Sequence, residues 1–239
     1  MPITGFDDDA NTKIQRCKEL FSSVYYESSV IGQLVQIRDA RETDLDFLKI
    51  YRRTYIPKEW FIRTDHYPDL VFRQFGANLA FSEKKHILDR VLENEEIERI
   101  SHNVIEYADL RSALLRIVER TTQTPLVMFL PINYYTRFHI DWVRNNNREL
   151  RISYPQGATI LGHNITVYWS NKYMPLNSFI LLDKGFGQWI SKPNFNNRLQ
   201  VTITDSDKAD QLDFLAFTTF KFDITNTNRA IILDDTSNP

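Results

Sequence analysis

Apolar and polar positions repeat along this chain with two periods, one typical of helices and one typical of strands. The clearest helical period covers residues 107–121. Its apolar face consists of Tyr107, Leu110, Leu114, Ile117 and Val118. Its polar face consists of Arg111, Arg116, Glu119 and Arg120. We therefore expect a half-buried helix here, with the arginines either forming a basic surface or pairing with acidic groups.

A longer helical pattern covers residues 69–94. Its apolar stripe is expected to contain Leu70, Val71, Gln74, Phe75, Leu79, Ile87, Leu88, Val91 and Leu92. Gly76 and Ser82 interrupt the pattern. Either both residues kink one long helix, or Ser82 caps a second helix that begins at Glu83. A shorter helix is predicted over residues 133–144, after Pro131.

The beginning of the chain gives weaker signals. Residues 1–12 are polar and acidic, which indicates a flexible arm. Ile14, Cys17, Phe21 and Val24 follow at helical spacing. The run VIGQLVQI at residues 30–37 favours a strand, and prolines at both ends of residues 56–68 favour extended chain.

The second half of the chain is dominated by strand patterns. Residues 126–130, LVMFL, predict a strand buried on both faces. Residues 157–190 hold four of the seven glycines between short strand patterns, and GFG at 185–187 predicts a tight turn with positive φ. Three further strands are expected at 199–204, 220–224 and 229–233, with a turn at 205–211 between the first two. The fold class is α+β.

Composition excludes several functional classes. The net charge of −2 is spread evenly, so the chain lacks the basic character of a nucleic-acid-binding domain. Cys17 is the only cysteine, which excludes an intrachain disulfide and a cysteine-based zinc site. We expect no membrane segment, because no apolar run is long enough to span a bilayer. The polar, acidic beginning of the chain predicts no signal peptide and synthesis in the cytoplasm. We also expect no cofactor.

One pattern suggests an enzyme. His139-Ile140-Asp141 with the more distant His163 resembles the two-histidine, one-carboxylate set of non-haem iron oxygenases. Here His139 and Asp141 lie in a helical pattern, where positions two apart point to different sides. The alternative is that Phe138 and Trp142 pack inward while His139 and Asp141 are solvated.

The order of these elements resembles the Hong Kong 97-type fold of tailed-phage major capsid proteins and encapsulin shells, over roughly residues 68–235. The resemblance rests on a long helix, an amphipathic helix, a buried strand ending at Pro131 and a short helix. It continues with Gly162, a Met174-Pro175 turn, a strand ending at Asp183-Lys184-Gly185 and a last strand at residues 230–233. Residues 25–67 leave little room for the long extended loop of such shells.

The resemblance implies four parts in the chain. These are an N-terminal arm and extended segment (1–67), the spine helix of a peripheral domain (68–100), an axial domain (101–198), and return strands with a C-terminal tail (199–239). It implies no catalytic, cofactor-binding or metal-binding residue.

The implied function is a structural subunit of an icosahedral shell, a virus- or phage-like major capsid protein. Its partners would be copies of itself, with weak non-specific contacts to nucleic acid or protein cargo inside. It would reside in the virion after synthesis in the host cytoplasm. An encapsulin-like nanocompartment in the cytoplasm is the alternative, and an iron oxygenase is a third hypothesis. From their expected exposure, we select as subunit contacts Trp60, Phe61, Tyr67, Asn145, Asn147, Asn171, Tyr173, Asn194 and Asn197.

Overall fold

The chain divides into two compact units, each assembled from three stretches of sequence. The computed structural model describes residues 8–41, 48–59, 67–120, 126–134, 138, 150–153, 157–160, 163–169, 175, 177–191, 199–207 and 210–237. The first unit combines Met1–Ile31, Ile37–Lys84 and Trp189–Lys221. The second unit combines Gly32–Gln36, Lys85–Gln188 and Phe222–Pro239. Each unit has its own buried cluster of apolar side chains.

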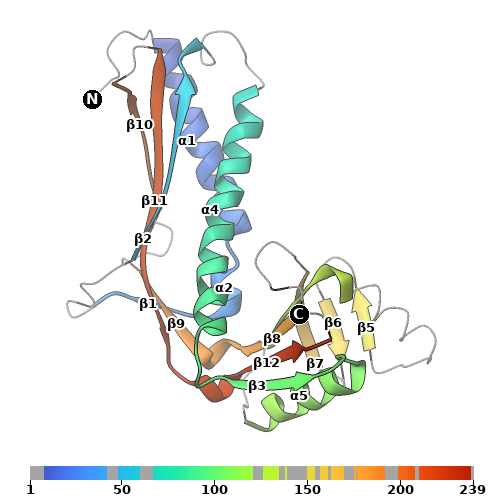
Figure 1. Cartoon of the computed structure of the whole chain (residues 1–239). Coiled ribbons are helices and arrows are strands. Elements are labelled where there is room, and N and C mark those ends of the chain that lie inside the picture. Colours follow the sequence, from blue (N-terminus) through green and yellow to red (C-terminus); the bar gives the residue numbers. More distant parts are fainter. Residues whose placement is uncertain are drawn as a thin grey trace. The chain divides into compact units, whose positions relative to one another are not determined.

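The first unit contains two long helices, α1 (Asp8–Ser28) and most of α4 (Tyr67–Leu92) (Figure 1). The predicted helical spacing in α1 is confirmed for Ile14, Cys17 and Phe21, which are buried, whereas Val24 is half-buried and Tyr25 is buried in its place. The predicted flexible arm is wrong for residues 8–12, because the helix begins at Asp8. Asp and Asn near a helix start favour its N-terminus, and this signal explains the earlier beginning.

Helix α4 is a single helix of 26 residues, so the second helix that Ser82 was expected to cap does not form. The Ser82 hydroxyl instead donates to the backbone carbonyl of Asn78, one turn earlier, at 2.9 Å. At Gly76, a Cβ atom would lie 2.5 Å from the carbonyl oxygen of Phe21. Glycine is therefore required at this position because α1 approaches the α4 backbone too closely for any side chain.

The predicted apolar stripe of α4 is wrong at its beginning and correct further along, where Leu79 is buried and Phe75 packs against the core. Ile87, Leu88 and Val91 are fully buried. Leu70, by contrast, is 69% exposed, and Phe72 is buried in its place. The run Leu70-Val71-Phe72 is apolar at consecutive positions, so the pattern fixes the helix but not which side of its first turns faces the core.

A five-stranded sheet packs against these helices. Its strands are β1 (Gln36–Asp39), β2 (Leu48–Pro57), β9 (Gly187–Ser191), β10 (Leu199–Asp205) and β11 (Gln211–Ile224). The order is β1-β9-β11-β10, and β2 also pairs with β11. Alternate residues of β11 face the helices, and Phe214 contacts the rings of Phe21, Phe72 and Phe75. The core of the first unit is therefore largely aromatic.

Two strand predictions for this sheet need correction. The run at residues 30–37 is not one strand, because Ile31–Leu34 forms the short helix α2 and only β1 follows as strand. Ile31, Leu34 and Val35 are all completely buried, and a short continuous apolar run cannot distinguish a buried helix from a strand. The strand expected at 220–224 is the end of the 14-residue β11. The predicted strand at 199–204 is confirmed as β10.

The second unit contains a seven-stranded sheet and helix α5 (Tyr107–Arg120). Its strands are β3 (Glu98–His102), β4 (Leu126–Leu130), β5 (Leu150–Ser153), β6 (Gly157–Ile160), β7 (His163–Trp169), β8 (Ser178–Asp183) and β12 (Ala230–Asp235). Their order is β3-β12-β8-β4-β7-β6-β5. Two short 3₁₀ helices, η1 (Lys184–Phe186) and η3 (Thr227–Arg229), lead out of β8 and into β12.

The helix predicted at 107–121 and the strands predicted at 126–130 and 229–233 agree with α5, β4 and β12. The apolar face of α5 packs Leu110, Leu114 and Ile117 into a cluster with β4, β8 and β12. Every residue of β4 is buried, as its continuous apolar sequence predicts. The helix expected at 133–144 is described only at residues 132–134 and 138, where it is helical.

Candidate functional site

The predicted subunit contacts fall almost entirely outside the described residues. Tyr67 is the exception, and it is the first residue of α4. The structure does not describe Trp60, Phe61, Asn145, Asn147, Asn171, Tyr173, Asn194 or Asn197. These positions therefore stay predictions.

The residues of the hypothetical iron site are not brought together by the described part of the chain. His139 and Asp141 lie outside the described residues, and His163 begins β7, where its backbone pairs with Ile160 of β6. Within the described residues, no three His, Cys, Asp or Glu side chains are grouped so that they could hold a metal ion. None of the described helices is long and apolar enough to cross a membrane.

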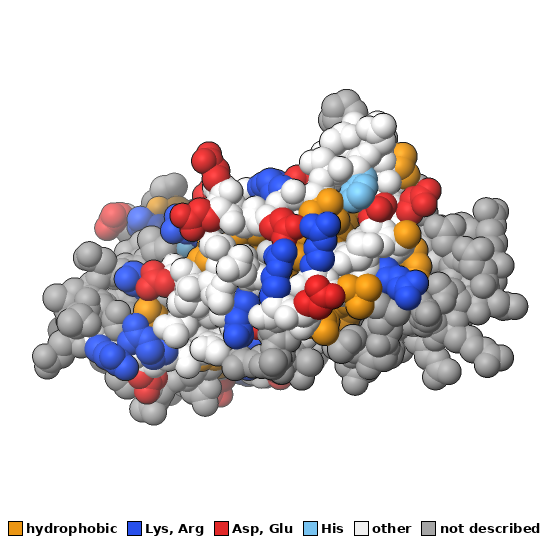
Figure 2. Space-filling model, turned by 90° about the horizontal axis from the view of Figure 1, so that it is seen from below, with side chains coloured by type: hydrophobic (Ala, Val, Ile, Leu, Met, Phe, Trp, Pro, Cys, Tyr) orange, Lys and Arg blue, Asp and Glu red, His pale blue; other side chains and the backbone are white. Residues whose placement is uncertain are grey.

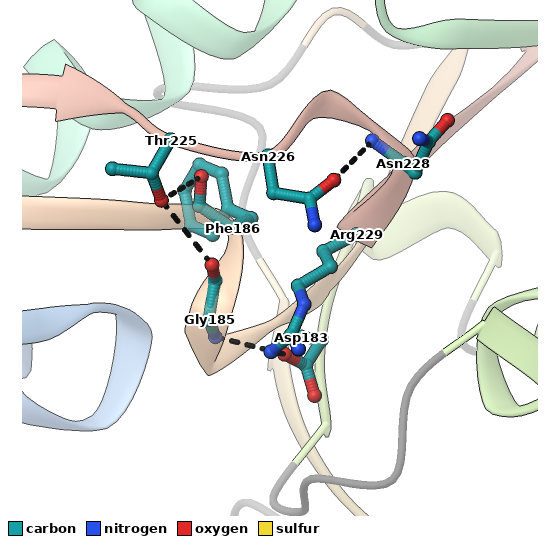
Figure 3. A network of polar contacts seen from close by, with 7 residues as sticks. All are labelled: Asp183, Gly185, Phe186, Thr225, Asn226, Asn228 and Arg229. Atoms are coloured by element: carbon teal, nitrogen blue, oxygen red, sulfur yellow. Dashed lines mark hydrogen bonds and ion pairs between the residues drawn. The ribbon is translucent and has the colours of Figure 1, made fainter.

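The most deeply buried charge of the second unit is Asp183, at the end of β8 (Figure 3). Its carboxylate is completely buried and accepts a hydrogen bond from the backbone N–H of Gly185 at 2.8 Å. The Arg229 guanidinium forms an ion pair with the same oxygen at 2.9 Å. A buried carboxylate needs hydrogen bonds in place of the water it has lost. Here the Gly185 N–H and the Arg229 guanidinium both donate one.

The glycines at 185 and 187 serve close packing and not a turn with positive φ, so that prediction is wrong. Gly187 has φ −152°, which is extended backbone. A Cβ atom at Gly187 would lie 2.7 Å from the ring of Phe222. One at Gly185 would lie 1.9 Å from Nη1 of Arg229. Both glycines leave room for side chains that come from the end of β11 and from η3.

The segment before β12 is held against η1 by backbone hydrogen bonds. The N–H groups of Thr225 and Asn226 both donate to the Phe186 carbonyl, at 2.9 and 3.1 Å. The Asn226 side chain accepts from the N–H of Asn228 at 3.1 Å and so caps η3, which positions Arg229 (Figure 3). We call Asp183, Gly185, Asn226 and Arg229 the β8–β12 clasp. These hydrogen bonds and the ion pair fasten the end of β8 to the segment before β12.

A second buried carboxylate, Asp235, anchors the end of β12. The Tyr134 hydroxyl and the N–H groups of Ile105 and Ser237 donate to it. Burial alone would raise the pKa of Asp235, but hydrogen bonds from Ser237, Tyr134 and Ile105 outweigh burial and lower the pKa below its ordinary value. The carboxylate is therefore ionised and holds the chain after β12 in place.

The outer face of α5 carries ion pairs between residues of opposite sign. Glu98 of β3 contacts Arg116 at 2.6 Å and Arg120 at 2.5 Å. Burial raises the pKa of Glu98, but hydrogen bonds from Arg120 and Arg116 outweigh burial and lower it. The ion-pair alternative is thus confirmed for these two arginines. On the face drawn in Figure 2, basic and acidic side chains are interspersed.

The side of the first unit's sheet turned away from α1 and α4 carries polar, aromatic and half-buried apolar side chains. There Thr202 of β10, Leu215 of β11 and Arg53 of β2 lie side by side in register. Asp213 pairs with Arg53 at 2.8 Å, and Tyr55 is 48% exposed. Half-buried apolar groups among aromatic and polar ones give this face a composition found in protein contacts.

Comparisons with known proteins identify the fold but no close relative. No protein-family model matches the chain, and no curated protein matches it. A virus-like particle protein from Pyrococcus furiosus is 10% identical, with TM-score 0.64, over 92% of this chain and 98% of that chain. An encapsulin from Synechococcus elongatus PCC 7942 is 11% identical, with TM-score 0.58, over 86% of each chain. A structure of Mycobacterium phage Che8 is 12% identical, with TM-score 0.56, over 81% of this chain and 74% of that chain. The chain therefore has the Hong Kong 97-like fold of phage capsids and encapsulins.

Proposed function

We propose that this chain is a structural subunit that assembles with copies of itself into a closed icosahedral shell, as the major capsid protein of a virus- or phage-like particle. The observation that carries the proposal is the fold match across 92% of the chain and 98% of a virus-like particle protein. Phage capsids match over most of this chain as well. A fold match alone does not fix function, so the polar groups of the chain provide the second argument.

Those polar groups support association over catalysis. The buried carboxylates Asp183 and Asp235 are both engaged in bonds that hold β8 and β12. Arg116 and Arg120 of α5 pair with Glu98, which neutralises part of their charge. In this proposal residues 68–100 supply a spine helix, 101–198 an axial domain and 199–239 return strands, while residues 1–67 form an arm that includes α1.

An encapsulin-like nanocompartment is the second candidate. The match to the S. elongatus encapsulin over 86% of both chains favours it. The two candidates differ in content and location. A viral shell encloses nucleic acid and resides in the virion, whereas a compartment encloses protein cargo in the cytoplasm. The predicted contacts at Trp60, Phe61 and Tyr67 serve either candidate, because both require repeated interfaces between identical chains.

The test is to purify the full chain from its native source or an expression host and to separate it by gel filtration. The proposal expects uniform particles in negative-stain electron microscopy. Nuclease treatment, the ratio of absorbance at 260 and 280 nm, and denaturing gels of the particles then distinguish nucleic acid from protein cargo. A small species that binds iron and gains thermal stability from it would instead support the oxygenase hypothesis.

A further inference from the structure

The outermost strand of the first unit's sheet, β10, is an edge strand with an unusual sequence. Among the strands that the structure describes, β10 hydrogen-bonds to β11 alone (Figure 1). Every second residue of an edge strand turns its N–H and C=O groups away from the partner strand. Such an edge can pair with another chain, so soluble proteins protect it with charges, prolines or short length.

The sequence of β10, LQVTITD, has none of these protections in its first six residues. Its only charge is Asp205 at the end, which pairs with Lys58 at 3.0 Å. Four consecutive β-branched residues at positions 201–204 favour an extended backbone.

The other described edges are protected. Strand β2 carries Lys49, Arg52, Arg53 and Pro57, while β1 and β5 have only four residues each and contain an arginine. Strand β3 carries Glu98, Arg99 and His102. Protection is therefore missing at one edge, which indicates that this edge has a partner.

The side chains of β10 show which partner fits. Ile203 is 4% exposed, while Leu199 and Val201 on the same face are only partly buried against the core. On the opposite face Thr202 and Thr204 are exposed. An antiparallel second copy centred on Thr202 would place Val201 opposite Ile203 and Gln200 opposite Thr204, so that residues of like polarity meet over the five central positions. At each end of this ladder Leu199 would lie opposite Asp205.

Charge also selects this arrangement. In the antiparallel pairing the two Asp205 carboxylates lie at opposite ends of the ladder, whereas a parallel pairing would set them side by side. No other charge lies on the strand. An icosahedral shell contains two-fold axes, and a strand that pairs with its own copy is a two-fold contact.

We propose that β10 pairs with β10 of a second copy of this chain, antiparallel and centred on Thr202, so that two sheets become one continuous sheet across a two-fold axis. The inference rests on the proposed shell function, of which it specifies one contact. The main-chain hydrogen bonds of the ladder provide the attraction, and the central Thr202 pair defines the register.

Cysteine cross-linking tests the register. In the proposed ladder the two Thr202 Cα atoms lie about 4.5–5.5 Å apart, which a disulfide can bridge. The two Thr204 residues would be displaced by four positions, about 13 Å, which is beyond disulfide reach. Thr204→Cys is thus a matched control on the same exposed face, and the native Cys17 is buried at 3% exposure.

Under mild oxidation, Thr202→Cys is expected to give at least about tenfold more disulfide-linked dimer than Thr204→Cys on non-reducing gels, because disulfide reach is short. A co-expressed mixture of Gln200→Cys and Thr204→Cys chains should cross-link, while each of these alone should not. Normal particles without a Thr202→Cys dimer, or equal cross-linking of Thr202→Cys and Thr204→Cys, overturn the pairing. Register-specific dimers without particles support the pairing and contradict the shell function, so the two claims fail separately.

Discussion

The central strands of the second unit's sheet are buried on both faces, whereas the first half of β11 in the first unit's sheet is fully buried on one face only. All residues of β4 and β8 are buried, with Leu181 in the cluster beneath α5 and Val127 and Ile180 buried on the other side. In β11 the burial alternates over residues 211–217, as expected for a sheet with helices on one side only. The central strands of the second unit thus have no exposed face among the described residues, while the first unit keeps half-buried and exposed positions along β10 and the first half of β11.

The largest loss of stability that would test this comparison is expected from a substitution in β11. Phe214→Ala removes a fully buried ring that contacts three others, so we expect it to lower the free energy of unfolding by roughly 3–5 kcal/mol. The neighbouring Leu215→Ala, on the open face, should lower it by less than about 1 kcal/mol. Urea unfolding at a single protein concentration measures both. Equal losses would contradict a sheet buried on one face.

The matching experiment in the second unit should give two similar losses. Ile180 and Leu181 are neighbours in β8 that point to opposite faces, and both are almost completely buried. Ile180→Ala and Leu181→Ala are each expected to lower the free energy of unfolding by roughly 2–5 kcal/mol. If one of the two is nearly neutral, one face of this sheet is open and the contrast between the units is lost.

The next largest loss of stability is expected from substitutions in the β8–β12 clasp. Arg229→Ala leaves the buried Asp183 carboxylate with the Gly185 N–H but without its cation, so we expect a loss of about 2–3 kcal/mol in the free energy of unfolding. In the double variant Asp183→Asn/Arg229→Ala no charge is stranded, so the combined loss should be smaller than the sum of the single ones. Strict additivity would show that the ion pair contributes nothing.

The smallest effect is a pH dependence in the second unit. The pKa of Asp235 is lowered below its ordinary value of 3.8, so its carboxylate stabilises the fold above this value, and that stability is lost as pH falls through the folded-state pKa. We expect Asp235→Asn to lower the free energy of unfolding by roughly 1–2 kcal/mol at neutral pH and by less at low pH. Wild-type and variant curves that stay parallel from neutral pH to pH 3 would contradict this assignment.

The elements with strong periodicity were the ones that the sequence could predict. α5 and β10 each carry one clear period, and β4 is a continuous apolar run of strand length, so packing agrees with local pattern. The run at 30–37 was misassigned, because residues buried on every side leave no period to distinguish helix from strand. The clasp could not be predicted either, since Asp183 and Arg229 are 46 positions apart and only the sheet order brings them together.

The order of predicted helices and strands was enough to indicate the family resemblance. The proposed contact at β10 depends instead on the position of this strand at a sheet edge. The sequence LQVTITD predicts a strand from its alternation, but not that the strand lies at a sheet edge. Edge position depends on pairing with β11 and on the absence of a second neighbour among the described strands. Contact residues selected by expected loop exposure, such as Asn145, stay predictions.

The central claim is that this chain builds a shell from copies of itself, and the mass of the assembled species tests it most directly. Sedimentation velocity of the purified full chain over a series of salt concentrations should show one fast-moving species that contains many copies, with closed particles in electron micrographs of the same fraction. A species of one or two chains at every salt concentration would contradict the account.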